Sequence, residues 1–192
     1  MLAEAKFGFP AAYDVQLLDE FPATGEGRVL YVPPPGTRGG RDGMPVRITP
    51  DNGAPWIGIF AFATTDGSGY RQIASCPHPD QLCVVAGGAA YVVNVRETST
   101  WWEVTPLYVG DVRQVVDRRI LLFADSVSLL AWGENGLLWK TTPLAMDRVA
   151  IDEVGRDFVS GRGWDASIPG YIRYRVRLDD GLVVDGVKRW FA

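Results

Sequence analysis

The chain has 192 residues, of which 47% are hydrophobic and 11% aromatic, including 7 tryptophans. This composition supports a sizeable core and excludes an intrinsically disordered chain. The net charge is −4 with 22% charged residues. Proteins that bind nucleic acid usually carry a basic excess, so we expect no nucleic-acid partner.

The first ten residues bear on location. They lack the basic segment followed by a long apolar stretch that marks a signal peptide. No window approaches the roughly 18 consecutive apolar residues that a membrane-spanning helix needs. We therefore expect a cytoplasmic protein of bacterial type that has no membrane partner.

One β-rich domain is expected over residues 1–192, because a single all-β unit of this length is ordinary. Residues 1–55 form its irregular N-terminal part. Within it, Arg28–Val32 has the pattern of a strand, whereas Tyr13–Leu18 fits either a strand or one or two helical turns. Proline and glycine crowd residues 33–43, which we predict to be a flexible loop.

Residues 56–192 show short apolar runs separated by turn residues, as expected of a hairpin-rich core. Leu82–Ala86 and Ala90–Val95 flank Gly87-Gly88 and are apolar at nearly every position. Strands buried on both faces have this continuous pattern. We therefore predict that these two strands lie in the middle of a sheet.

The C-terminal half carries the strongest turn signals. Asn135-Gly136 separates two apolar runs, Ser128–Trp132 and Leu137–Trp139. Both turn positions of such a hairpin need positive φ, which Asn and Gly adopt at low cost. Asp-Gly at 180–181 gives the same signal between Tyr171–Leu178 and Leu182–Val187, and Gly155-Arg156 joins a further pair of runs.

These patterns predict an all-β protein with little helix: an antiparallel two-layer sandwich or a partly closed barrel built from successive hairpins. A partial propeller is the third architecture that the hairpins permit. Propeller blades need about 40 residues each and repeat detectably along the chain, whereas we find one copy of the Gly-x-x-Gly-Leu-Leu-Trp pattern. The sandwich needs fewer coincidences.

Catalytic motifs are scarce. The one histidine, His78, lies between two prolines, and no Gly-x-Ser-x-Gly or phosphate-binding glycine motif occurs. Cys76, Asp80 and Cys83 lie in the same loop and nominally complete four metal ligands with His78, but their spacing matches no zinc template. We predict no catalytic residues, no metal and no cofactor, and the sequence leaves open whether the two thiols are bonded.

The most unusual segment is Tyr171–Leu178. Because side chains alternate across a strand, Tyr171, Arg173, Arg175 and Arg177 share one face and the apolar residues share the other. Neighbouring guanidiniums repel unless acidic groups lie opposite. Those groups are either carboxylates on an adjacent strand, such as Asp152 or Asp157, or an acidic ligand or partner surface.

Two further segments are candidate binding sites. Trp101 and Trp102 are adjacent on a predicted strand and must point to opposite faces, so one of them lies outside the main core. Arg162, Trp164 and Asp165 lie in a glycine-rich segment. An exposed tryptophan beside polar groups suits a protein contact or sugar stacking, and a small cluster under a loop is the structural alternative.

No motif is specific enough to transfer residue roles from a known family. We predict a binding or protein–protein interaction protein without catalytic activity, for example a toxin-neutralising immunity protein or an assembly subunit, whose partner has an acidic surface. The alternative is a carbohydrate-binding module or a small glycan-active hydrolase that uses exposed tryptophan with paired carboxylates. A small ligand, a glycan or a second copy of the chain are the other partners that the sequence permits.

Overall fold

The computed structural model describes residues 4–23, 25, 27–36, 42–168 and 170–186. These residues are almost entirely in strands, with one short 3-10 helix, η1 (Val116–Arg118). The all-β prediction is confirmed, and Tyr13–Leu17 is a strand rather than a helical turn. The strands are β1 (Glu4–Lys6), β2 (Tyr13–Leu17), β3 (Arg28–Val32), β4 (Gly43–Pro50), β5 (Trp56–Ala61), β6 (Gln72–Ser75), β7 (Gln81–Ala86), β8 (Ala89–Asn94), β9 (Trp101–Glu103), β10 (Val109–Val115), β11 (Ile120–Asp125), β12 (Leu129–Gly133), β13 (Gly136–Lys140), β14 (Asp147–Val154), β15 (Phe158–Asp165), β16 (Gly170–Arg177) and β17 (Val183–Asp185).

The contacts between Cα atoms divide the chain into unit 1 (Met1–Tyr108) and unit 2 (Val109–Ala192). Each unit contains two sheets, and we describe each unit by itself. The single domain expected over residues 1–192 stays a prediction. No helix in the described ranges is long and apolar enough to cross a membrane.

Unit 1 contains the sheets β2-β4-β5-β3 and β1-β6-β7-β8-β9. Most neighbouring strands are antiparallel, but β1 pairs with β6 and β3 with β5 in parallel. Strands of both sheets contribute to one core, which includes Phe60 from β5 and Val84 from β7. The prediction that 82–86 and 90–95 belong to central, doubly buried strands is confirmed, because β7 and β8 are interior strands with buried side chains along almost their whole length.

Strand β4 was missed by the sequence analysis. It contains Pro45, a residue that usually argues against an interior strand because it has no N–H to donate. The carbonyl of Pro45 nevertheless accepts a hydrogen bond from the Leu18 N–H, 3.0 Å away. The flexible loop predicted at 33–43 lies partly outside the described residues, since 37–41 are not among them.

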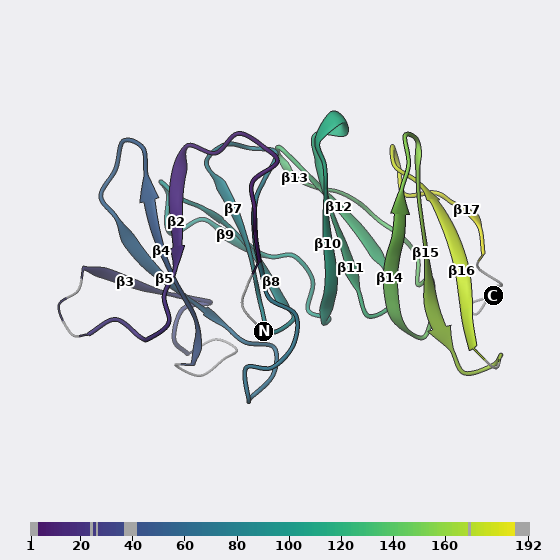
Figure 1. The fold of residues 1–192 in the computed structure, drawn as a ribbon, viewed down its shortest axis with the longest axis horizontal. Helices are drawn as coiled ribbons and strands as arrows, with labels where there is room; N and C mark the ends of the chain where they lie inside the picture. The colour runs from purple at the N-terminus through teal and green to yellow at the C-terminus, as the bar shows by residue number, and fades with distance from the viewer. Residues whose placement is uncertain (1–3, 24, 26, 37–41, 169, 187–192) are drawn as a thin grey trace. The chain divides into compact units, whose positions relative to one another are not determined.

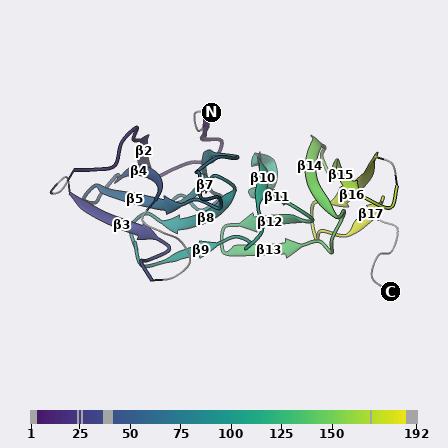
Figure 2. The same ribbon diagram turned by 90° about the horizontal axis from the view of Figure 1, so that it is seen from below.

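Unit 2 contains two sheets of four antiparallel strands, each in chain order: β10-β11-β12-β13 and β14-β15-β16-β17. Figure 1 shows the second sheet in green to yellow, and in Figure 2 the arrows of β12 and β13 point in opposite directions. The predicted hairpin between β12 and β13 forms, but its turn is Glu134-Asn135, because Gly136 (φ +115°) pairs with Gly133 as the first residue of β13. Asn135 does not have positive φ, so the predicted turn at Asn135-Gly136 with two positive-φ residues is wrong. Buried residues of both sheets, such as Leu122 and Val159, share one core.

The four sheets consist largely of successive hairpins, as predicted, and each described sheet has two open edges rather than closing into a barrel. Within each unit two sheets share a core, so the two-layer description applies there. Four antiparallel strands in chain order are also the topology of a propeller blade.

Candidate functional site

Most of the predicted site residues lie on the solvent-exposed face of β15 and β16. Burial alternates along β16: Tyr174 and Val176 are buried, whereas Arg173 and Arg175 are exposed. This is the alternation expected for one face on a core and one in water. The predicted shared face of the arginines therefore exists.

The register of the two strands brings the predicted residues of two segments together. Trp164 of β15 lies opposite Tyr171 of β16, and Arg162 lies opposite Arg173. Residues directly opposite on an antiparallel pair share a face, with Cβ atoms about 5 Å apart. We call this face the arginine–aromatic surface and define it by Phe158, Ser160, Arg162, Trp164, Tyr171, Arg173, Arg175 and Arg177.

Two arginines of this surface are ion-paired within the chain. The Arg162 guanidinium lies 3.1 Å from the Asp152 carboxylate on β14. Arg177 donates to both carboxylate oxygens of Asp180 in the β16–β17 turn, from Nε at 2.9 Å and from a terminal nitrogen. These contacts hold the pKa of Asp180 down at about 2, first through the hydrogen bond from Arg177 and then through the Leu182 N–H.

The other two arginines have no ion pair among the described residues. The Arg175 guanidinium lies over the Phe158 ring, with Cζ 4.2 Å from the ring centroid, in a cation–π contact, and Asp185 of β17 lies opposite Arg175 in register. Arg173 lies between Arg162 across the strand pair and Arg175 along its own strand, so its nearest charged neighbours in register are cations. The acidic residues Asp152 and Asp157, considered as partners for the arginines of β16, pair with other arginines.

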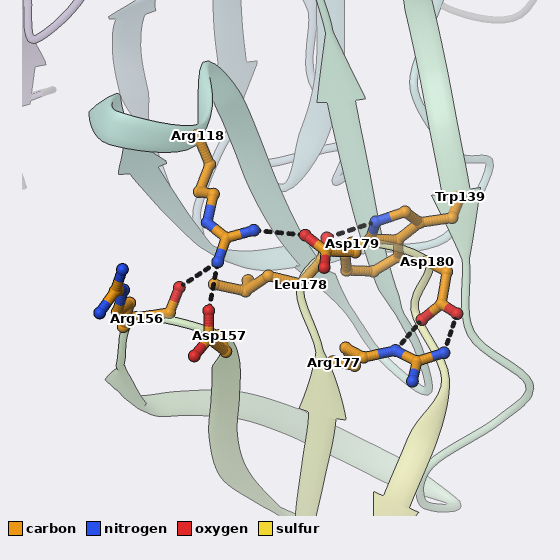
Figure 3. Close-up of polar contacts among 8 residues, drawn as sticks. All are labelled: Arg118, Trp139, Arg156, Asp157, Arg177, Leu178, Asp179 and Asp180. Atoms are coloured by element: carbon orange, nitrogen blue, oxygen red, sulfur yellow. Dashed lines mark hydrogen bonds and ion pairs between the residues drawn. The ribbon is translucent and has the colours of Figure 1, made fainter.

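Asp157 belongs to a network at the end of unit 2 (Figure 3). Arg118 in η1 contacts the carboxylates of Asp157 and Asp179 and donates to the Arg156 carbonyl at 2.9 Å. In the same region the Trp139 indole N–H donates to the Leu178 carbonyl at 2.9 Å. These contacts connect η1 and β13 to the β14–β15 and β16–β17 turns. No local sequence signal marks these contacts, because the partners lie 38 or more residues apart.

The remaining predicted site residues lie elsewhere. Asp165 is buried, and its carboxylate accepts the Ser167 N–H at 2.9 Å. This is the local turn contact typical of Asp and offers little to a ligand. Trp101 and Trp102 are on β9 in unit 1, where Trp101 packs edge-on against Tyr91 and Trp102 is exposed. Their predicted opposite orientation agrees with this burial.

A cavity of about 490 Å³ in unit 1 contains two carboxylates. Its described lining includes Asp42, Glu103, Phe62 and Tyr91 but no tryptophan. Burial, and secondly the charge of Glu103, raise the pKa of Tyr91 to about 12. The pairing of acids with an exposed tryptophan that a glycan site would use is therefore not found in this lining.

Cys83 is in β7 and not in the loop with Cys76 and Asp80 that the sequence predicted, and Cys76 directly follows β6. Both thiols are buried and unbonded, and burial raises the pKa of each. The His78 Nδ1 accepts the Asp80 N–H at 3.1 Å. No group of three metal-ligating side chains was found within the described ranges.

No family model and no curated protein matches the chain. Two solved structures are similar in fold. A chain from a complex of S. cerevisiae Dbp5, Nup159, Gle1, IP6 and ADP gives a TM-score of 0.41 at 10% identity, covering 96% of this chain and 54% of that one. The N-terminal domain of Nup159 gives 0.40 at 13% identity, covering 98% and 55%. The chain thus spans about half the length of both, and similarity at this level carries no inference about function.

Proposed function

We propose that this protein is a non-catalytic binding module that holds a protein partner through the arginine–aromatic surface, and that the partner contributes acidic side chains. The observation that carries the proposal is a row of exposed arginines in which Arg173 and Arg175 form no ion pair among the described residues, beside exposed aromatic side chains. A toxin to be neutralised and a larger assembly are the two settings that fit such a module.

The aromatic end of the surface suits a protein contact. Trp164 and Tyr171 are 39% and 51% exposed and lie opposite each other in register. Tryptophan, tyrosine and arginine are the residue types that dominate binding energy at protein interfaces. An apolar side chain of the partner would pack on these rings.

The middle of the surface suits carboxylates. A guanidinium presents N–H donors in a fork that matches a carboxylate, and such charge-assisted bonds are stronger than neutral ones. Arg173 and Arg175 are both in the centre of the strand, and the internal acids Asp152 and Asp180 are already engaged by Arg162 and Arg177. An acidic partner would pair with Arg173 and Arg175, which form no ion pair within the part of the chain that the structure describes.

The glycan alternative has less support. Trp164 lies among arginines, whereas the cavity with two carboxylates is lined by Phe62 and Tyr91. Paired carboxylates and a stacking tryptophan are therefore not combined at one described site.

The test is quantitative capture of partners from the cells of origin, with wild-type protein and the Arg173→Glu/Arg175→Glu variant as baits. The matched control is Arg113→Glu/Arg156→Glu, which makes the same change in charge on exposed side chains of unit 2 outside the surface. We expect at least one acidic protein to be retained by wild type and control and lost from the surface variant.

Circular dichroism should give the same strand signal for all three proteins, because the substituted side chains point into solvent. Retention of every specific partner by the surface variant would contradict the proposal. Equal loss from the control variant would also contradict it, because binding would then follow total charge rather than this surface.

A further inference from the structure

We infer that the partner segment held by the arginine–aromatic surface is an extended strand that carries acidic side chains at alternate positions, two residues beyond an apolar one. This inference rests on the proposed function and specifies the partner's conformation and pattern. It follows from the order of Tyr171, Arg173 and Arg175 along one face of β16.

The spacing of the two arginines favours an extended partner. Side chains two residues apart on one face of a strand are about 6.6–6.8 Å apart. Alternate side chains of any extended peptide have the same spacing, so a segment lying along β16 places one carboxylate at each of Arg173 and Arg175. In a helix, residues two apart point in different directions, and side chains that share a face recur every three or four residues.

One of these guanidiniums is held in place. Arg175 Cζ lies 4.2 Å from the centroid of the Phe158 ring, so the guanidinium is restrained by an aromatic side chain of the neighbouring strand. Stacking leaves the N–H edges available for a carboxylate, and a restrained guanidinium loses less rotational entropy on binding. Phe158 is therefore a positioning residue for Arg175.

The surroundings limit where the acidic side chains fit. At one end, Arg177 is occupied by Asp180. On the flanking strands, Glu153 lies opposite Ser160 and Asp185 lies opposite Arg175, and both are exposed acids. A partner carboxylate at Arg175 therefore competes with Asp185, and both acids disfavour carboxylates displaced sideways from β16. At the other end, Tyr171 and Trp164 offer rings to an apolar side chain.

The experiment compares two peptides of the same composition by calorimetry and by NMR perturbation of the Trp164 indole. The first is acetyl-Leu-Thr-Glu-Thr-Glu-Thr-amide, with alternate acids. The second is acetyl-Leu-Thr-Thr-Glu-Glu-Thr-amide, in which an extended chain points the two acids to opposite sides. We expect the first to bind about tenfold more tightly, the worth of one additional charge-assisted contact.

Four variants test which residues distinguish the two peptides. Arg173→Glu/Arg175→Glu should abolish binding of the alternating peptide, and Arg113→Glu/Arg156→Glu should not. Phe158→Leu keeps an apolar side chain but removes the stacking ring, and should reduce the ratio between the two peptides, while Phe158→Tyr should restore it. A merely structural role of Phe158 would change both affinities by the same factor.

If wild type binds the two peptides with equal affinity and the Arg173→Glu/Arg175→Glu variant binds neither, the inference of an extended partner with alternate acids is overturned, and the proposed function stands. Absence of binding by both peptides would overturn the pattern as well, while the capture experiment decides the function independently. Binding that the surface variant does not weaken would overturn both.

Discussion

Strands β7–β8 of unit 1 and β15–β16 of unit 2 are both long antiparallel hairpins, yet they divide their side chains differently. In β7 every residue is buried, so the alternate sets that include Leu82 and Cys83 both face protein. In β15–β16 one set is buried and the other carries arginine, tryptophan and tyrosine into solvent.

The number of covered faces decides which side chains a strand can carry. A strand covered on both faces can carry little but apolar side chains, because a charge there would be desolvated. A strand covered on one face has half of its positions free of any role in the core. In this protein the second kind of strand supplies the candidate site.

The largest expected effect contrasts one residue from each hairpin. Leu82→Ala removes a fully buried side chain of β7 and should lower the free energy of unfolding by about 2–5 kcal/mol. Arg173→Ala, on the outer face of β16, should change it by no more than about 0.5 kcal/mol. Denaturant unfolding of the two variants measures both values. Similar losses would contradict the division between the hairpins.

A second prediction concerns the buried side of β15. A Cβ on Gly161 would lie 2.1 Å from the Ala150 carbonyl and 2.4 Å from the Tyr174 hydroxyl, which are themselves hydrogen-bonded at 2.8 Å. Gly161→Ala should therefore cost about 2–3 kcal/mol of stability through overpacking. Gly155→Ala is the matched control, because its nearest neighbour would be a carbonyl at 3.4 Å. Thermal unfolding that ranks the two variants in the opposite order would contradict this packing.

The smallest effect is a titration on the exposed side. The lowered pKa of Asp180 means that its pairing with Arg177 stabilises the fold at pH values above 3.8 and is lost as the pH falls towards about 2. NMR titration of the Asp180 carboxyl should show this, and Arg177→Gln should raise its pKa towards 3.8. Asp66, whose pKa is lowered to about 2 by hydrogen bonds involving Ser68 and Thr64, should not change in that variant. An unchanged Asp180 titration would show that the Leu182 N–H dominates.

Local chemistry explains which parts of the fold the sequence predicted. The β12–β13 hairpin and the alternation along 171–178 depend on neighbouring residues, and both were predicted correctly, although the turn is Glu134-Asn135 and not Asn135-Gly136. The parallel pairs β1–β6 and β3–β5 join segments without a shared turn, so no local signal marks them. Strand β4 was not predicted because Pro45 has no N–H to donate to a neighbouring strand, which argues against a strand in sequence. The strands that pair with β4 cannot be identified from the residues around Pro45.

In the candidate site, too, local features could be predicted from the sequence and contacts between strands could not. Alternation placed the arginines on one face, but the register that sets Arg162 opposite Arg173 depends on the length of the connecting turn. The stacking of Arg175 on Phe158 follows from that register and had no signal of its own. The burial of Asp165 and the turn that it caps could not be distinguished in sequence from an exposed loop, and its role in binding stays a prediction.

The cation–π contact of Arg175 with Phe158 has an evolutionary consequence. Both side chains project from the solvent side of their strands, so substitutions at these two positions leave the hydrophobic interior intact. Substitutions there need no compensatory stabilising ones, so we expect related chains to diverge fastest on this side of the sheet.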